Sequence, residues 1–239
     1  MSGVSALARR TLDPLRRSVE ALLAFAYPQR CPGCGAGVDP RRFLCDPCRD
    51  AIPRLSIPLC VACLLADREP VGCTKHQGFS VRAPWLYDPR IEPMVHALKY
   101  HDRRDLAETL GEEMVAALPP GSRPELVLAV PLHPARLRER GYNQAAWLAD
   151  RVAERIGAPR LDGVLERRRA TRPQAKLGPR ARRDNLALAF SLAAPRAVEG
   201  REVLIVDDVL TTGATLAAAL APLRDAGARA SGLTVAWAQ

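Results

Sequence analysis

Long apolar stretches are missing from this sequence of 239 residues. The longest uncharged run near its start, residues 21–29, is nine residues long, whereas a membrane-spanning helix needs about 20. The first residues also lack the apolar core and the small-residue cleavage site of a secretory signal. From these absences we expect a cytoplasmic protein without a membrane span.

Two familiar catalytic patterns are missing as well. Nothing resembles a Walker phosphate loop, and no set of residues resembles a Ser-His-Asp arrangement. Charge, by contrast, is abundant and unbalanced, since 35 Lys and Arg against 26 Asp and Glu give a net charge of +9. This balance favours an anionic partner, either a phosphorylated metabolite or a nucleic acid.

Cysteine is missing after Cys73, and this absence divides the chain. All seven cysteines lie within 28–80, a segment rich in Pro and Gly with almost no regular periodicity. From Trp85 onward, apolar runs alternate with helical patterns, which is typical of βαβ units and a mostly parallel sheet. We predict an amphipathic helix over 1–27, a cysteine-rich domain over 28–80 and an α/β domain over 85–239. The first helix either packs on the protein itself or rests on a membrane surface.

Particular elements are expected within the α/β domain. Helical patterns cover 91–118, with a break near 100–104, and 142–156, which Gly157 closes. Short apolar runs at 126–130 and 203–206 predict buried strands. A helix over 214–226 containing Pro222 and a closing strand over 232–238 complete this part.

Two Cys-x-x-Cys pairs begin the cysteine-rich segment. They are Cys31-Pro-Gly-Cys34 and Cys45-Asp-Pro-Cys48, separated by ten residues. Two such pairs supply the four thiolates of a tetrahedral zinc shell, and a cytoplasmic protein keeps thiols reduced rather than disulfide-bonded. Because protein atoms fill all four positions, we predict a structural Zn²⁺ that stabilises a loop-rich segment and takes no part in catalysis.

A second set of candidate ligands follows the first. It consists of Cys60-Val-Ala-Cys63 and Cys73-Thr-Lys-His76, in which His76 stands where a fourth cysteine is expected. Three thiolates and one imidazole form a chemically sound zinc site, and we predict one here. Two alternatives stay open, because this set can be degraded so that one zinc is bound in all, or the ligands of the two sets can interleave.

The sequence then offers two adjacent carboxylates at the end of an expected strand. The string is Val203-Leu-Ile-Val-Asp207-Asp208-Val-Leu-Thr211-Thr212-Gly213-Ala214-Thr215. Open α/β sheets bind ligands at the carboxyl ends of their strands, and the helix start at 214 offers N–H groups and a positive dipole to an anion. We expect Asp207 and Asp208 to accept hydrogen bonds from ribose hydroxyls and to hold water bound to Mg²⁺. The alternative is a strand that merely ends in two acids before a capped helix.

This string resembles the phosphoribosyl pyrophosphate (PRPP) signature of the type I phosphoribosyltransferases. After the strand expected at 126–130 comes PLHPARLRERGYNQ at 131–144, which carries Arg138 and Arg140, and TRPQ follows at 171–174. Together with the cysteine pairs, these strings are similar to the ComF family over nearly the whole chain. Many relatives carry an eighth cysteine where this chain has His76, which puts the second metal site in doubt.

The resemblance implies a type I phosphoribosyltransferase-like α/β domain, with a mostly parallel sheet flanked by helices, preceded by a zinc finger. It implies that 211–215 bind the phosphate of PRPP or of a phosphoribosylated nucleotide, and that a basic loop carrying Arg138 and Arg140 meets pyrophosphate. Family members are associated with uptake of single-stranded DNA during natural transformation. An uptake helicase and a recombination mediator are the implied protein partners.

The most basic stretch is 160–184, with nine Lys or Arg against three acids. Pro173, Gly178 and Pro179 argue against one continuous helix there. The stretch fits a flexible arm over an active site, a loop that contacts nucleic-acid phosphates, or a plain solvated loop. Aromatic residues are nearly absent nearby, which weakens a sequence-specific nucleic-acid role.

Three functions are therefore weighed. The leading one is a PRPP-loop protein that binds phosphoribosyl ligands and single-stranded DNA during DNA uptake. The second is an active, Mg²⁺-dependent phosphoribosyltransferase, in which a base or amine attacks the anomeric carbon while pyrophosphate leaves. The third is a binding module that keeps the loop only for its fold and makes contacts through the zinc finger and the basic stretch.

Overall fold

The computed structural model describes residues 30–39, 42–167 and 189–239. The helix expected over 1–27 lies outside these residues, and so does most of the basic stretch at 160–184. The chain forms two compact units, Met1–Ala51 and Ile52–Gln239. No helix in the described part of the chain is long and apolar enough to cross a membrane.

The smaller unit is rich in turns and has one short described helix, α2 (Asp46–Asp50). Its turn at residues 31–36 is closed by the Gly35 N–H, which donates to the Cys31 carbonyl at 2.7 Å. Gly35 has a φ of +74°, a left-handed conformation that suits glycine because it has no Cβ. No residue of α2 is buried, so this segment needs a source of stability other than an apolar core.

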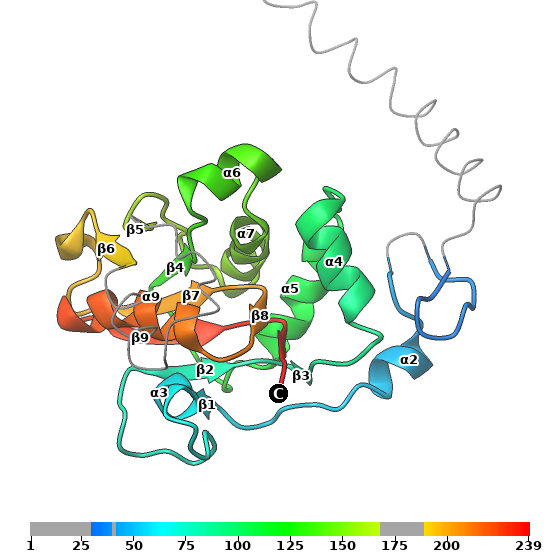
Figure 1. Ribbon diagram of the computed structural model, residues 1–239, viewed down its shortest axis with the longest axis horizontal. Coiled ribbons are helices and arrows are strands. Elements are labelled where there is room, and N and C mark those ends of the chain that lie inside the picture. The colour runs from blue at the N-terminus through cyan, green and yellow to red at the C-terminus, as the bar shows by residue number, and fades with distance from the viewer. Residues whose placement is uncertain (1–29, 40–41, 168–188) are drawn as a thin grey trace, which may run out of the picture. The chain divides into compact units, whose positions relative to one another are not determined.

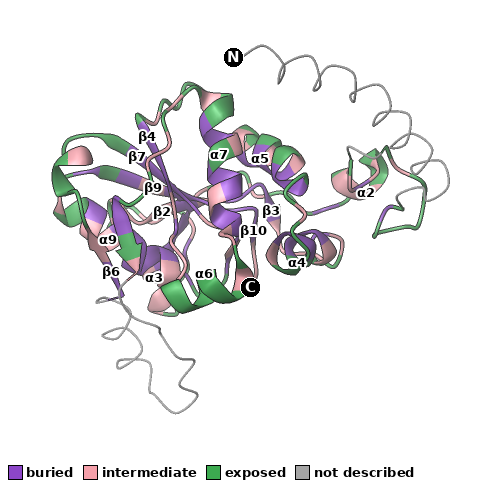
Figure 2. Cartoon of the chain, turned by 90° about the horizontal axis from the view of Figure 1, so that it is seen from above, coloured by how far each residue is buried: buried purple, intermediate pink, exposed green. Residues whose placement is uncertain are grey.

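The larger unit is built on a five-stranded sheet (Figure 1). In spatial order its strands are β1 (Leu59–Cys60), β2 (Ser80–Arg82), β9 (Arg229–Leu233), β7 (Glu202–Val206) and β4 (Leu126–Ala129). All neighbouring strands run parallel except β1 and β2, which are antiparallel. Residues 203–206 of β7 are buried without interruption, as expected of an apolar run covered on both faces of a parallel sheet. In Figure 2 the middle of this sheet is drawn largely in the purple of buried residues.

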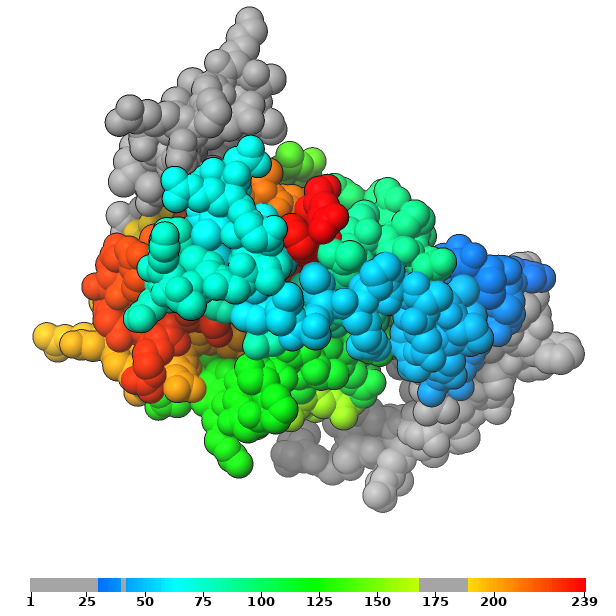
Figure 3. Space-filling model, turned by 90° about the horizontal axis from the view of Figure 1, so that it is seen from below, coloured from blue at the N-terminus to red at the C-terminus, as the bar shows by residue number. Residues whose placement is uncertain are grey.

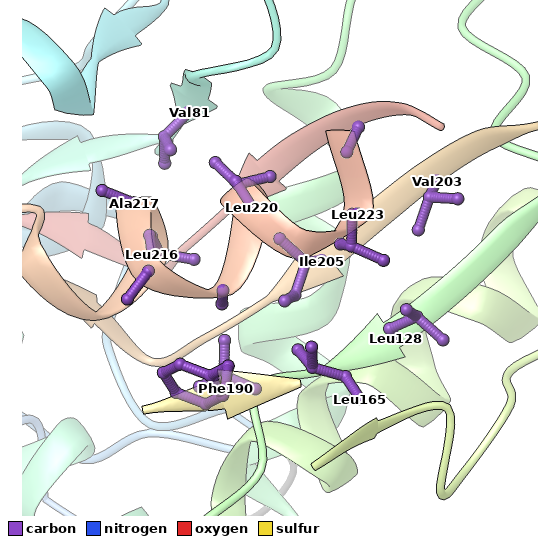
Figure 4. Close-up of a cluster of buried hydrophobic side chains, with 14 of the residues drawn as sticks. Val81, Leu128, Leu165, Phe190, Val203, Ile205, Leu216, Ala217, Leu220 and Leu223 are labelled. Carbon is purple, nitrogen blue, oxygen red and sulfur yellow. The ribbon is translucent and has the colours of Figure 1, made fainter. Parts of the chain in front are cut away.

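Helices cover both faces of this sheet. Helices α7 (Gln144–Ile156) and α9 (Ala214–Asp225) contact the strands directly, α5 (Leu106–Ala116) packs on α7, α4 (Glu92–Tyr100) on α5 and α3 (Val61–Leu65) on α9, while α6 (Pro134–Arg140) buries no residue. Leu220 and Leu223 of α9 pack with Ile205 of β7 in one hydrophobic cluster, which Phe190 and Leu165 close from below (Figure 4). Alternation along β7 turns its other side chains to the opposite face, where α7 contacts β4 and β7 and packs against α5.

Two small sheets complete the larger unit. Strands β3 (Trp85–Leu86), β10 (Ala236–Trp237) and β8 (Val209–Leu210) form a parallel group in that order. Strands β5 (Leu165–Arg167) and β6 (Phe190–Leu192) pair antiparallel, and the short 3-10 helix η1 (Pro195–Ala197) follows β6. Because β8 lies directly after Asp208 and pairs with β10, the last residues of the chain are tied to the acidic segment.

The expected fold class is confirmed: a mostly parallel sheet flanked by helices. Most predicted elements also lie where the sequence places them. They are the helices at 92–100, 106–116, 144–156 and 214–225 and the strands at 126–129 and 202–206.

Two expectations are wrong. The segment predicted as a basic loop after β4 contains helix α6, which starts at a His133 cap, where Nδ1 accepts from the Ala135 N–H at 3.2 Å. The single closing strand is two strands, interrupted at Thr234 and Val235.

The second set of candidate metal ligands folds as part of the larger unit. The compact units divide between Ala51 and Ile52, and all four ligands of the second set lie after this point; the domain bounds 28–80 and 85–239 stay a prediction. Leu59 pairs with Val81 in β2, and Val81 pairs in turn with Gly232 in β9. The segment that carries Cys60 is therefore hydrogen-bonded, through β2, to the main sheet.

Candidate functional site

The acidic pair follows the central strand directly. Asp207 comes after the last residue of β7, and its N–H donates to the Leu233 carbonyl of the neighbouring strand β9 at 3.0 Å. The chain then forms β8 and an exposed turn at Thr211 and Thr212 before α9 begins. The pair and the turn thus lie at the carboxyl end of the parallel strands, where this class of sheet binds ligands.

Gly213 shapes the start of α9. It is the N-cap residue, with a φ of +76°, and no side chain caps the first turn. The first helical hydrogen bond runs from the Ala217 N–H to the Gly213 carbonyl at 2.8 Å, so the N–H groups of 214–216 precede the helical ladder. Partly exposed Ala214 and Thr215 leave these donors close to solvent, where a phosphate group can accept from them.

Asp208 is held in a buried network. Its side chain is 8% exposed, and its Oδ1 lies 3.0 Å from Lys99 Nζ of α4. Gln144 Nε2, at the start of α7, donates to Oδ2 at 2.6 Å, and the Val209 N–H donates to Oδ1 at 2.7 Å. With three partners on two oxygens, this carboxylate joins α4, α7 and the loop.

Asp207 differs from its neighbour in its electrostatics. Burial, together with the charge of Asp208, raises the pKa of Asp207 to about 7, although hydrogen bonding and the charges of Lys99 and Arg167 oppose the shift. Its Oδ1 accepts from the Asp208 N–H at 2.9 Å. Asp207 therefore changes charge near neutral pH, and shifted groups of this kind are common at functional sites.

The two arginines expected near pyrophosphate both lie on α6 but in different settings. Arg138 is exposed. Arg140 is partly buried, and its Nη1 donates to Gln144 Oε1 at 2.5 Å. Its guanidinium also lies 5.1 Å from the centroid of the Tyr100 ring. The structure thus connects Arg140 through Gln144 to Asp208, and phosphate binding by either arginine stays a prediction.

Three participants in this network were assigned no role from the sequence. Lys99, in the last turn of α4, was given no function of its own. Gln144 was noted only as part of the RGYNQ string. Arg167 ends β5, and its positive charge acts on Asp207, while burial lowers its own pKa. Each comes from an element distant in sequence from 207–215, so only tertiary contacts reveal the connection.

The eight candidate metal ligands form two separate groups, without interleaving. In each group the four ligand atoms lie within 4.8 Å of one another. They are Cys31, Cys34, Cys45 and Cys48 in the smaller unit, and Cys60, Cys63, Cys73 and His76 in the larger one. The two sets predicted from the sequence are thus each brought together in space.

The spacing of these ligand atoms fits zinc. A tetrahedral shell with zinc–ligand distances of about 2.0–2.3 Å places two sulfurs about 3.8 Å apart and a sulfur and a nitrogen about 3.6 Å apart. Nδ1 of His76 lies 3.5, 3.4 and 3.4 Å from the sulfurs of Cys60, Cys63 and Cys73. The sulfurs of Cys34 and Cys45 are 3.6 Å apart. Both groups are closed shells of protein atoms, which suits structural zinc.

A hollow of about 470 Å³ lies elsewhere in the larger unit. It is lined by residues at the amino ends of β7 and β9, among them Glu202, Arg229 and Ala230. Ligands of open α/β sheets bind at the opposite, carboxyl end. We therefore place the candidate site at 207–215 and not in this hollow.

Comparison with known proteins agrees with both parts of the chain. Residues 143–239 match the phosphoribosyl transferase domain, and residues 22–75 match the double zinc ribbon domain. DNA utilization protein YhgH of Salmonella typhimurium is 33% identical over 82% of this chain and 84% of its own. Competence protein F of Haemophilus influenzae is 30% identical over 78% of this chain and 87% of its own.

A similarity is also found among solved structures. The structure titled as the allosteric regulatory enzyme of purine biosynthesis covers 59% of this chain and 30% of its own, with 22% identity and a TM-score of 0.38.

Proposed function

The chain belongs to the ComF family, and on this premise we propose that its loop at 207–215 binds the phosphate and ribose of a phosphoribosyl ligand, either PRPP or a nucleotide. We propose further that it does so as part of DNA uptake or use, the role that the names of its relatives carry. The supporting observation is the open start of α9 at Gly213, directly after two acids at the carboxyl end of the central strand.

The chemistry of the loop matches such a ligand. The N–H groups of 214–216 and the hydroxyls of Thr211, Thr212 and Thr215 can donate to a terminal phosphate. Asp207 can accept from ribose hydroxyls without breaking the Lys99–Asp208 pair. If the ligand is PRPP, its pyrophosphate brings Mg²⁺, which prefers oxygen ligands and keeps several of its waters; the carboxylates of the acidic pair can hold such waters.

Calorimetric titration tests this proposal. PRPP with Mg²⁺ is titrated into zinc-loaded protein and into two variants, Asp207→Asn and Gly213→Ala. We expect micromolar binding by the wild type and at least about tenfold weaker binding by both variants, since each loses one ligand contact or the loop geometry. Absence of binding by the wild type, to PRPP and to nucleotide monophosphates alike, contradicts the proposal.

Phosphoribosyl transfer is a second candidate function, which the pKa of Asp207 favours. A carboxylate with a pKa of about 7 suits a group that must stabilise charge near neutral pH. In the reaction the bond from the anomeric carbon to pyrophosphate breaks, the bond to the acceptor nitrogen forms, and the acceptor loses a proton to solvent. If ionised Asp207 is needed, pyrophosphate release rises as pH increases through about 7. Absence of release across a panel of bases and amines argues for binding alone.

Binding of single-stranded DNA is supported by an aromatic and basic surface beside the site. Tyr100 is 59% exposed, the Arg140 guanidinium lies over its ring, and the His96 ring lies 4.8 Å away. Exposed aromatic rings beside cations stack nucleic-acid bases without regard to sequence. The arm residues Arg180, Arg182 and Arg183 lie outside the described residues.

The DNA proposal is tested with a fluorescent oligothymidine at several salt concentrations. We expect salt-sensitive binding, weakened by Tyr100→Ala and retained by Tyr100→Phe, because the ring and not the hydroxyl stacks. Charge reversal at Arg180, Arg182 and Arg183 should weaken binding as well. If the wild type does not bind at low salt, this part of the proposal is wrong, whatever the outcome with PRPP.

A further inference from the structure

Val61 stands between two metal ligands in the sequence, Cys60 and Cys63, and its side chain belongs to the core. It follows Cys60 directly and begins α3, which also carries Cys63. Its side chain is fully buried and belongs to the same hydrophobic cluster as Leu216 and Leu220 of α9. Its N–H donates to the Phe79 carbonyl at 3.0 Å. Val61, between two metal ligands in the sequence, is thus part of the hydrophobic core that also contains α9, the helix that follows the loop at 207–215. We call this loop the phosphate loop.

The loop at 207–215 lies very close to Val61 at Gly213. A Cβ placed on Gly213 would lie 3.0 Å from Cβ and 3.2 Å from Cγ1 of Val61, closer than almost all real carbon contacts. Helices α3 and α9 are in contact, and Figure 3 shows the cyan segment that includes α3 lying against the orange and red atoms of the carboxy-terminal part. The lack of a side chain at Gly213 therefore serves two needs, its positive φ and this close approach.

The second metal group has ligands on both sides of Val61. Its four ligands are Cys60 at the end of β1, Cys63 in α3, and Cys73 and His76 in the segment that follows α3. A helix of five residues, such as α3, has too few hydrogen bonds to be stable on its own. One end of the segment is anchored, because the Cys60 N–H donates to the Pro70 carbonyl at 2.8 Å and Leu59 pairs with β2. A metal ion held by the four ligands would tie α3, which begins at Val61, to the segment that carries Cys73 and His76.

We propose that Val61 positions the phosphate loop, so that the second metal group, but not the first, controls the affinity of the site for phosphorylated ligands. The proposal rests on the function proposed above for 207–215. Val61 packs against Gly213 and so keeps the N–H groups of 214–216 in one arrangement. When the second group loses its metal, α3 loosens, the loop gains freedom, and a phosphate group must order it again on binding.

A pair of valine truncations tests the contact itself. Val61→Ala removes two methyl groups beside Gly213. Val198→Ala removes the same atoms from another fully buried position of the same cluster, after η1. For PRPP with Mg²⁺ we expect Val61→Ala to weaken binding about tenfold while two zinc ions stay bound, and Val198→Ala to leave binding within about twofold of wild type. Equal effects of the two truncations overturn the proposal.

A pair of ligand substitutions tests the control by the metal. Cys73→Ser disrupts the second group and Cys34→Ser the first. Each variant is expected to bind one zinc less than wild type by elemental analysis. We expect faster amide hydrogen exchange at 217–220, the first hydrogen-bonded amides of α9, in Cys73→Ser and wild-type exchange there in Cys34→Ser. Val61→Ala should show the same faster exchange with its zinc content intact, which keeps the test valid if Cys73→Ser fails to fold.

The two readouts separate this proposal from the proposed function. Hydrogen exchange at 217–220 needs no ligand, so it decides the coupling even if wild-type protein does not bind PRPP. Unchanged exchange in Val61→Ala shows that Val61 does not position the loop, even where PRPP binds well. Faster exchange in Val61→Ala, in a protein whose wild type does not bind PRPP, supports the coupling and contradicts PRPP as the ligand.

Discussion

At the scale of residues, two adjacent carboxylates have taken different roles. Asp208 is buried and held by Lys99, Gln144 and a backbone N–H. Asp207 has a pKa raised to about 7. The sequence presents the two as equivalent, since both follow the same strand. Asp207 is therefore the better candidate for contact with the ligand, while Asp208 holds the site together.

The raised pKa of Asp207 has a consequence for stability. Its folded pKa of about 7 lies above the ordinary value of 3.8, so folding favours the protonated acid, and stability is lost as pH rises from about 4 to about 7. Asp207→Asn removes this loss and keeps an oxygen for the Asp208 N–H. We expect the variant to have the larger free energy of unfolding, with a margin about 1 kcal/mol greater at pH 8 than at pH 6.

Urea unfolding of zinc-loaded wild type and variant at the two pH values measures this margin. Both proteins keep their metal ligands, so any release of metal affects the two alike. An equal margin at pH 6 and pH 8 would mean that Asp207 is already ionised at pH 6.

The Lys99–Asp208 pair makes a second prediction at this scale. Lys99→Met leaves a buried carboxylate without its cation, so we expect a loss of about 2–4 kcal/mol in the free energy of unfolding. This loss is slightly below the range for fully buried pairs because the Lys99 side chain is 26% exposed. The double variant Lys99→Met/Asp208→Asn removes both charges and should recover part of this loss. Urea unfolding of the single and double variants measures the coupling, and purely additive losses contradict it.

At the scale of elements, the site depends on how α5 supports α7. Helix α7 carries Gln144 at its start, and its Asn143 cap donates from Nδ2 to the Val130 carbonyl after β4 at 3.0 Å. Behind it lies Gly111 of α5, where an added Cβ would come 2.7 Å from Cβ of Arg151. Glycine in mid-helix is unfavourable by itself, so this close approach of the two helices explains why it fits here.

Gly111→Ala sets two effects against each other. Alanine gains about 1 kcal/mol in helix propensity, but overpacking at a contact made by a Cβ that cannot rotate away costs about 1–3 kcal/mol. We expect a net loss of about 1 kcal/mol in the free energy of unfolding, measured by urea unfolding. Adding Arg151→Gly reopens the space, so the double variant should lose less than the sum of the two single variants. A more stable Gly111→Ala protein contradicts the close approach.

At the scale of the whole molecule, the two metal groups belong to different compact units. The group in Met1–Ala51 stabilises a segment whose described helix buries nothing, whereas the group in Ile52–Gln239 is joined to the main sheet through β1 and β2. Zinc should therefore affect the two units differently, because only the second group is bonded to a large core.

Calorimetry of ligand-substituted proteins tests this difference. Cys34→Ser should abolish the ordered smaller unit and leave the main thermal transition within about 2 °C of wild type. Cys73→Ser should lower the main transition by several degrees, about 2–4 °C for each kcal/mol lost in a chain of this size. Equal shifts of the main transition in the two variants contradict the division into separate units.

The sequence alone determined the fold class, the positions of the central strands and the two sets of metal ligands. These features are local: an apolar run such as 203–206 is buried wherever it lies, and Cys-x-x-Cys spacing brings two thiolates together without help from the rest of the chain. Gly213 was also predictable, since a turn before a helix favours glycine.

Only the tertiary structure decided which distant residues share the site. Lys99, Gln144 and Val61 lie on three different helices, and no pattern in the sequence connects any of them with Asp208 or Gly213. Helix α6 appeared where a loop was expected because the His133 cap and Gly141, with its φ of +82°, end a short helix that composition alone reads as loop. Periodicity and spacing describe one segment at a time, whereas burial, charge pairing and close approach arise between segments that meet only in the folded chain.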